Sequence, residues 1–365
     1  EVKLKVKPLL VGKKIKTRKI GVNFSSACSN LHDLRKNNEK KYMECHYDHT
    51  LRRLDYINKL TKSSQYYIPY ISTKIDVLQM MGYHERKKKK FSNAINYYER
   101  AYNLSVEIDN IESAKGWHKV KYYRESVFYD SPKERSAYKL GDLYLNYVGA
   151  IDYDKAKKYL TIASEDMYKA WRELGLMHLE GRGIKLDEKK AFEFLKKSSF
   201  HGSGFEHVYV ADFYLLGLGG QKKNFSKALR HFKLAELGSR GTINFSNIEV
   251  LYKYKKLPKD ANEFYSWLLE NIKKNSTSIP SIERLGYFSN TILKNYSEAY
   301  KWYYICSKTN FNKEENLLGQ ANIEVPEIKE RCSNKLEILE TEYLQSHKVD
   351  QAKIAADKWI KEFWN

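Results

Sequence analysis

Two cysteine–histidine pairs near the start of the chain are the residues whose types and spacing could do chemistry. His32 follows Cys28 by four residues, and His49 follows Cys45 at the same spacing. Side chains four residues apart share one face of a helix, so the two pairs could together supply the two thiolates and two imidazoles of a tetrahedral zinc site. The apolar spacing predicts helices over residues 27–40 and 42–61, which would have to position these side chains.

Two other interpretations of these residues stay open. Zinc motifs normally hold one ligand pair in a tight turn, and no glycine lies near either pair. Cys28 and Cys45 could instead form a disulfide, or their thiols could be unconnected, which is the simplest interpretation. Apart from this weak zinc candidate, the sequence predicts no metal and no cofactor.

The sequence offers little support for catalysis. It contains no Gly-x-Ser-x-Gly elbow, no phosphate-binding glycine-rich loop and no His-Glu-x-x-His motif. Gly217, Gly219 and Gly220 fall between two predicted helices and do not follow a strand, so they do not form a nucleotide-binding loop. We therefore expect a protein that is not an enzyme and has no small-molecule substrate.

Stretches 137–166 and 170–201 repeat one pattern. Each has a Leu-Gly pair in a first helix, an alanine near the start of a second helix, and a small residue seven positions later. These are Leu140, Gly141, Ala156 and Ala163 in the first stretch, and Leu174, Gly175, Ala191 and Ser198 in the second. Self-similarity at this period predicts a solenoid, a fold that grows by stacking units and needs no single core.

An earlier stretch carries Gly82, Ala94, Tyr98 and Ala101, and this pattern resembles the tetratricopeptide repeat. In that repeat, the glycine and alanines mark places where two helices approach closely. The longer turn of the later units, with Gly181-Arg-Gly-Ile, resembles the Sel-1-like repeat family. The resemblance implies an all-α, right-handed solenoid of antiparallel helix pairs.

Further units are predicted around residues 205–237, 242–271 and 285–306. Asp212 takes the glycine position in the first of these, the second is degraded, and the third has Leu285-Gly286. Cys306 takes a small-residue position and is interpreted as a packed core thiol. The predicted domains are a basic N-terminal segment with helices (1–65), the solenoid (66–325) and C-terminal capping helices (326–365). Residues 107–132 are ambiguous, with a helix expected over 113–128.

The charge balance points to the kind of partner. The chain has 65 Lys and Arg against 45 Asp and Glu, a formal net charge of +20. A basic surface favours an acidic partner, although a generally lysine-rich protein would show the same charge. The basic run Arg86–Lys90 falls in a predicted turn and is interpreted as a solvated turn. There is no apolar run of about 18 residues, so no transmembrane helix is expected.

The resemblance implies that the first helix of each pair lines a concave face and binds a protein partner there. Counting from each Leu-Gly glycine gives the candidate binding residues Gln79, Tyr83, Arg86, Tyr138, Asp142, Arg172, Leu176, Tyr209, Phe213 and Tyr287, with Leu145, Leu179, Leu216, Glu283 and Asn290 at related positions. Aromatic residues and arginine are enriched at protein interfaces, although packing between repeats is the alternative role for each.

The family resemblance implies a non-enzymatic interaction scaffold, in its finer form an adaptor or an immunity protein for a bacterial secreted effector such as a phospholipase-type toxin. Two alternatives remain. Lysines, arginines and tyrosines could bind nucleic acid, although acidic residues are interspersed among them. The second alternative is an envelope scaffold associated with polysaccharide. The compartment, periplasm or envelope against cytoplasm, depends on whether a signal sequence precedes Glu1.

Overall fold

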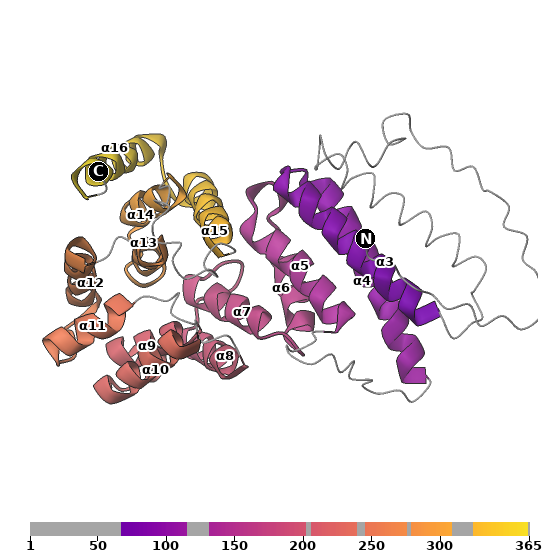
Figure 1. Ribbon diagram of the computed structural model, residues 1–365, viewed down its shortest axis with the longest axis horizontal. Coiled ribbons are helices and arrows are strands. Elements are labelled where there is room, and N and C mark those ends of the chain that lie inside the picture. The colour runs from indigo at the N-terminus through magenta and orange to yellow at the C-terminus, as the bar shows by residue number, and fades with distance from the viewer. Residues whose placement is uncertain are drawn as a thin grey trace, which may run out of the picture. The chain divides into compact units, whose positions relative to one another are not determined.

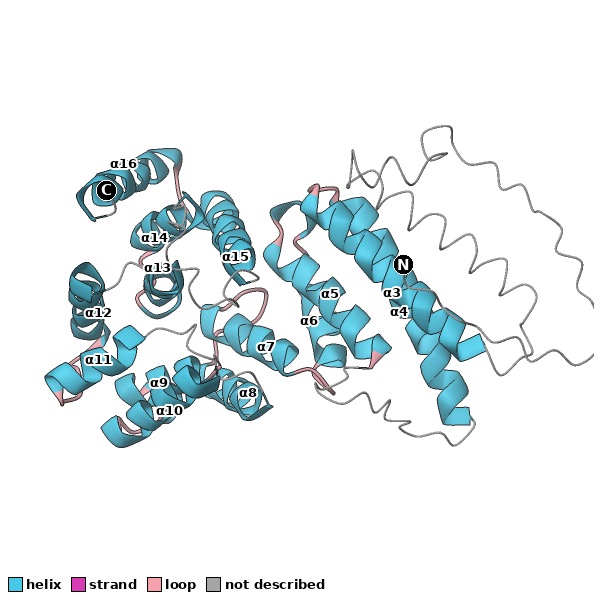
Figure 2. Ribbon diagram, in the orientation of Figure 1, coloured by secondary structure: helices cyan, strands magenta, loops and turns pink. Residues whose placement is uncertain are grey.

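The chain of the computed structural model divides into two compact units, residues 1–60 and 61–365. The structure describes residues 67–114, 131–201, 206–238, 245–275, 279–308 and 324–363, which all belong to the second unit. These residues form helices and turns, with no strand among them (Figures 1 and 2). The predicted all-α solenoid of helix pairs is confirmed. The predicted segment 1–65, with Cys28, His32, Cys45 and His49, lies outside the described residues, as does most of the helix expected over 113–128.

Consecutive helices pack in pairs along the chain (Figure 1). The pairs are α3 (Tyr67–Lys87) with α4 (Phe91–Ala114), α5 (Pro132–Asn146) with α6 (Tyr153–Ala163), α7 (Tyr168–Glu180) with α8 (Glu188–His201), α9 (His207–Leu216) with α10 (Phe225–Gly238), α11 (Phe245–Tyr254) with α12 (Ala261–Asn275), and α13 (Ile279–Tyr287) with α14 (Tyr296–Lys308). We number these pairs as repeats 1 to 6 and call the first helix of each the A helix and the second the B helix. Short helical turns join some of them: η2 (Val148–Ala150), η3 (Leu218–Gly220) and η4 (Phe288–Ile292).

The glycines of the Leu-Gly pairs lie where the A and B helices come closest. A Cβ atom added to Gly175 would stand 2.7 Å from Leu195 Cγ and 3.3 Å from the carbonyl oxygen of Ala191. A Cβ atom on Gly286 would stand 2.7 Å from the ring of Tyr303. The two distances of 2.7 Å are shorter than real Cβ atoms make. The predicted close approach of the paired helices is therefore confirmed.

The turn between A and B helices uses two recurring devices. The residue that ends the A helix, or follows it closely, has a positive φ in repeats 1 and 3 to 6, at Lys89, Gly181, Gly217, Lys255 and Lys294. The B helix then begins with an Asp or Asn whose side chain accepts a backbone N–H at 2.9–3.1 Å, at Asp152, Asp187, Asn224, Asp260 and Asn295. Such caps satisfy N–H groups that a helix start leaves unpaired. The Asp-x-x-Lys-Ala sequences at residues 152–156 and 187–191 are therefore capping signals for α6 and α8.

The apolar core falls into two clusters that meet in α7. Leu174 and Met177 belong to the cluster formed by repeats 1 to 3. Leu176 and Leu179, on the other side of the same helix, belong to the cluster that continues through repeat 6 to the last helix. The residues of α7 thus join two separately packed groups of repeats.

The C-terminal helices follow repeat 6. They are α15 (Glu324–Ile338), continued by the π-helical turn η6 (Leu339–Tyr343), and α16 (Ser346–Phe363), and both pack on α14. The indole of Trp359 on α16 meets that of Trp302 edge to face, with ring centroids 5.2 Å apart. While α16 covers α14 as a cap would, α15 also contacts α5 and η2 of repeat 2.

A disulfide joins Cys306 of α14 to Cys332 of α15. The interpretation of Cys306 as a packed core thiol was therefore wrong in its chemistry, although the side chain is fully buried as expected. The sequence pattern could not show this, because a cysteine in a small-residue position looks the same whether or not a distant helix brings a second sulfur to it.

Candidate functional site

The candidate binding residues on the A helices do not all lie on an accessible face. Gln79, Leu176, Tyr209 and Phe213 are buried, and the amide of Gln79 donates a 2.7 Å hydrogen bond to Ser136 in the next A helix. These four residues serve packing between repeats, so their proposed contact with a partner would require exposure that they lack.

The remaining candidates keep part of their surface accessible. Tyr83 is 38 % exposed, and five candidates are partly buried: Arg86, Tyr138, Asp142, Arg172 and Tyr287. Among the related positions, Leu145 and Leu179 are buried, while Leu216, Glu283 and Asn290 are partly buried. Partner contact by any of these residues stays a prediction.

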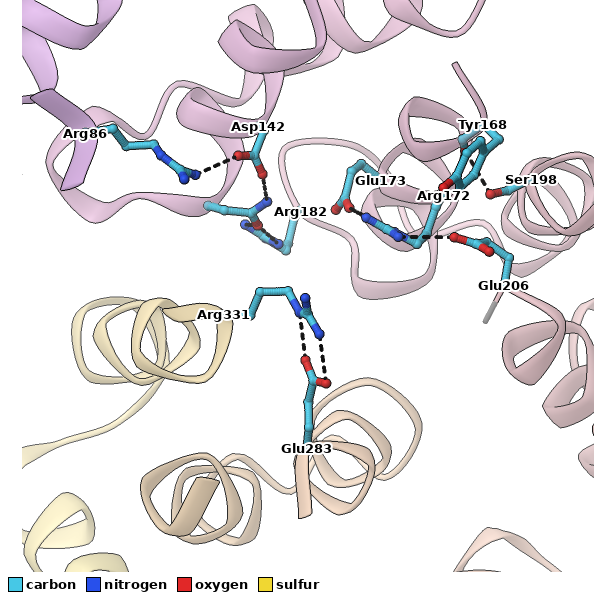
Figure 3. A network of polar contacts seen from close by, with 11 residues as sticks. Arg86, Asp142, Tyr168, Arg172, Glu173, Arg182, Ser198, Glu206, Glu283 and Arg331 are labelled. Atoms are coloured by element: carbon cyan, nitrogen blue, oxygen red, sulfur yellow. Dashed lines mark hydrogen bonds and ion pairs between the residues drawn. The ribbon is translucent and has the colours of Figure 1, made fainter. Parts of the chain in front are cut away.

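Arg86, in the last turn of α3, is the centre of a first polar cluster. Its guanidinium reaches Asp142 on α5 at 3.5 Å (Figure 3). It also bonds the hydroxyl of Tyr147 and lies 3.7 Å from Glu330 on α15. Burial alone would lower the pKa of Arg86, but Tyr147, Asp142 and Glu330 outweigh that effect and raise it. Arg86 is thus a permanent cation that joins repeats 1 and 2 to α15.

A second cluster surrounds Arg172 on α7. Its guanidinium lies 2.9 Å from Glu173 and 3.2 Å from Glu206, which immediately precedes α9 (Figure 3). Burial and the carboxylates of Asp142 and Glu173 raise the pKa of Tyr138 well above its usual value, so this hydroxyl stays protonated. The ion pair between Arg172 and Glu206 joins repeat 3 to repeat 4 on the A-helix side.

Residues of α15 complete this polar surface. Arg331 forms a two-pronged contact with Glu283 of α13, at 2.9 and 3.0 Å (Figure 3). One turn later, Lys335 lies 3.6 Å from Glu180 at the end of α7. We call the surface formed by the side chains of Arg86, Asp142, Arg172, Glu173, Glu180 and Glu283, from helices α3, α5, α7 and α13, the A-helix face. In the structure a helix from the same chain, α15, lies against it.

Glu180 is the most strongly perturbed acid of this surface. It is buried, and it accepts a 2.8 Å hydrogen bond from Thr291 besides its contacts with Lys335 and Arg182. Burial alone would raise the pKa of Glu180, but Lys335, Arg182 and Thr291 outweigh it and lower that pKa to about 2. Glu180 also lines a small pocket between α7, η4 and α15, which has room for about one water molecule.

Comparison with known proteins identifies the repeat. A family model of the Sel1 repeat matches residues 78–106, 135–166, 172–199, 207–237 and 280–305. The chain contains five Sel1 repeats. Proteins built from Sel1 repeats generally act as protein-interaction scaffolds and are typically not enzymes. The family assignment predicted from the Leu-Gly pattern and the long turn is confirmed.

Two solved structures are similar to the chain. One is a Sel1 repeat protein from Oxalobacter formigenes, with 16% identity and a TM-score of 0.39 over 73% of this chain and 100% of that one. The other is a protective antigen present in uropathogenic Escherichia coli strains and displaying an SLR fold, with 13% identity and a TM-score of 0.24 over 92% of this chain and 95% of that one. No curated protein matched the chain.

The helix pair α11–α12 is the one described pair that the Sel1 model does not match, in keeping with its degraded sequence pattern. A buried ion pair spans it. Asp212, in the glycine position of repeat 4, accepts hydrogen bonds from Arg284 of repeat 6, one of them 2.5 Å long. Both side chains are almost fully buried, and the guanidinium lies over the rings of Tyr287 and Phe288 at 5.0 and 5.6 Å. Repeats 4 and 6 are thereby joined directly.

Arg182 is a structural residue that the sequence interpretation missed. It stands between the two positive-φ glycines of the long Sel1 turn, and its guanidinium reaches back to the carbonyl of Leu145 and the side chain of Asn146 in repeat 2. Its position between Gly181 and Gly183 was the available signal, because the sequence interpretation had already marked this turn.

The described residues hold no candidate metal site. Among them, no group of three or more His, Cys, Asp and Glu side chains could hold a metal ion. Likewise, no helix within the described ranges combines the length and apolar character needed to cross a bilayer. The A-helix face contains arginines and carboxylates, with lysines and tyrosines beside them.

Proposed function

We propose that this Sel1 repeat protein is a non-enzymatic scaffold that binds a protein partner on its A-helix face. One observation carries the proposal: that face holds a protein helix, α15, through ion pairs with three separate repeats. A surface that accommodates a helix in this way has the charges and spacing to bind one supplied by another protein.

The composition of the accessible part supports a protein partner. Tyr83 is 38 % exposed, and the guanidinium of Arg86 lies 5.0 Å from the centre of its ring. Tyrosine and arginine are the residue types that dominate binding energy at protein interfaces. The net charge of +20 favours an acidic partner.

The finer proposal is an adaptor or an immunity protein for a bacterial secreted effector. It rests on what Sel1-type proteins do and on the basic surface, and the identity of the partner separates its two versions. A toxin domain whose activity is blocked in the complex would support immunity, whereas a partner that stays active in the complex would support an adaptor.

An affinity capture from the lysate of the native organism tests the proposal. The bait would be the full chain, compared with Lys87→Glu/Lys89→Glu at the end of α3 and with Lys157→Glu/Lys158→Glu on the exposed side of α6. The two double variants carry the same change of charge, one at the end of an A helix and one on a B helix. We expect a protein that is retained by the wild type and the α6 variant, is lost by the α3 variant, and is indifferent to nuclease.

Equal retention by all three baits would contradict the A-helix face as the binding site. Retention that disappears on nuclease treatment would instead support the nucleic-acid alternative, in which lysines and arginines neutralise phosphates.

A further inference from the structure

The basic turn Arg86–Lys90 is solvated in part and paired in part. Lys87, Lys89 and Lys90 are exposed, as the sequence interpretation expected. Lys87 also forms an ion pair with Glu330 of α15, and Lys89 forms one with Glu337 two helical turns further on. Arg86 lies 3.7 Å from Glu330 as well, and the hydroxyl of Tyr147 lies 3.4 Å from it. The ion pairs with α15 are what the sequence interpretation of this run did not include.

The spacing of the two carboxylates explains how one helix meets the turn. Glu330 and Glu337 are seven residues apart, so they lie on one face of α15, about 10.5 Å apart along its axis. Arg331 and Lys335, on a neighbouring face of α15, meet Glu283 in the middle of α13 and Glu180 at the end of α7. Acidic and basic faces of α15 thus each meet the opposite charge.

The two sides of α15 are held by different forces. On the side of repeat 6, Ile328 and Leu339 are part of the large apolar cluster, and Cys332 is bonded to Cys306. On the side of repeat 1, α15 is held by ion pairs and hydrogen bonds, and among the described residues the N-terminal core cluster includes no residue of α15. The contact with the basic turn is therefore the weaker one.

That weaker contact is accessible. The side chains of Lys87 and Lys89 are 36% and 67% exposed, and that of Glu337 is 37% exposed. Exposed ion pairs contribute about 0–1 kcal/mol each and weaken as salt is added. A competing carboxylate-bearing segment can exchange with such a contact without unfolding the repeats.

We propose that the basic turn Arg86–Lys90 is the docking site for a partner helix that carries two carboxylates seven residues apart, and that α15 is a built-in competitor for this site. The proposal rests on the proposed function and names the chemistry of the partner. Binding of the partner replaces Glu330 and Glu337 at Lys87 and Lys89. The displaced α15 stays with repeat 6, because the disulfide and the apolar contacts hold it there.

A synthetic peptide of residues 324–343 tests this without the natural partner. The peptide carries a fluorescent label and Cys332→Ser, and its binding to the full chain is followed by anisotropy in low salt. The wild-type chain should bind it weakly, because the tethered α15 competes at a high effective concentration. The chain with Glu330→Lys/Glu337→Lys, whose own carboxylates no longer occupy the turn, should bind it at least about tenfold more tightly.

A charge exchange supplies the matched control. The chain with Lys87→Glu/Lys89→Glu should not bind this peptide, but it should bind a peptide in which Glu330→Lys and Glu337→Lys have been made. All substituted side chains are at least partly accessible, and unchanged helical content and a single cooperative melting transition would show that each variant folds.

Three results would overturn the proposal. In the first, the Glu330→Lys/Glu337→Lys chain binds the peptide no better than the wild type does. In the second, the Lys87→Glu/Lys89→Glu chain binds the two peptides equally. In the third, an oligothymidylate of similar length binds as tightly as the peptide with the same dependence on Lys87 and Lys89, so that the turn selects negative charge and not a helix. A partner captured from lysate alongside any of these results would leave the scaffold function standing and the docking site refuted.

Discussion

At the scale of single residues, arginines of the A-helix face show how one side chain can join several repeats. Arg86 contacts Asp142 of α5, Tyr147 just before η2, and Glu330 of α15. Arg172 links α7 to Glu206, the residue before α9. A planar guanidinium presents five donors in a fixed arrangement, which lysine does not. These arginines are therefore positioned by their partners, whereas the neighbouring lysines keep more accessible surface.

Glu180 makes stability depend on acid. The pKa of Glu180 is lowered to about 2 from its usual value of 4.5, so the folded state holds the ionised form more strongly than the unfolded state does. Its contribution is present above pH 4.5 and is lost as the pH falls towards 2, with a size of about 3 kcal/mol at most. We expect Glu180→Gln to flatten the loss of stability between pH 5 and 2, measured by urea unfolding at each pH. A wild-type curve that runs parallel to that of the variant would contradict this.

The Asp212–Arg284 pair gives a second prediction. Burial raises the pKa of Asp212, and Arg284 offsets part of that shift. Asp212→Asn leaves Arg284 charged and buried without a counter-ion, so we expect a loss of about 3–5 kcal/mol in the free energy of unfolding. Replacing both residues by leucine should cost much less than the single change, because it removes both charges. Equal costs for the single and double variants would contradict the argument that the unpaired charge of Arg284 causes the loss.

At the scale of elements, each helix pair is specified by a close approach and a capped turn. We expect Gly175→Ala to destabilise the protein by about 1–3 kcal/mol, although alanine favours helices, because the new methyl group would overlap Leu195. Thermal or denaturant unfolding measures the change. The same substitution in a Leu195→Ala background should cost less, and a cost that is equal in both backgrounds would rule out this contact as the cause.

The disulfide is the element-scale feature that departs most from the pattern of the repeats. It closes a loop of 26 residues between α14 and α15, which by the chain-entropy argument stabilises the folded state by about 3–4 kcal/mol. Its placement fixes α15 to repeat 6. The charged face of α15 is thereby presented to the basic turn as part of a rigid end and not as a loose tail.

At the scale of the whole molecule, local features of the described repeats could be predicted from the sequence, and contacts between distant repeats could not. The Leu-Gly pairs, the Asp and Asn caps and the glycines of the long turn each follow from a few neighbouring residues. The pairing of Lys87 with Glu330 joins positions 243 residues apart. No period or spacing connects these positions, because they meet only when α15 returns along the A helices.

The candidate site shows the same division. Counting along the A helices marked Arg86, Asp142 and Arg172, which form ion pairs between helices, and their contact with a partner stays a prediction. It also marked Phe213 and Leu176, which packing against neighbouring repeats buries. Burial at these positions depends on which helix comes next to them, and a single repeat does not contain that information.

The central claim is that a protein partner binds the A-helix face beside the basic turn, and photo-crosslinking in the native cell tests it most directly. A photoreactive phenylalanine analogue would replace Tyr83, which lies beside Arg86 and Lys87, and separately Lys157 on the exposed side of α6. We predict a covalent adduct with one protein from position 83 and none with that protein from position 157. An adduct with the same protein from position 157 alone, or adducts from position 83 only with nucleic acid, would contradict the claim.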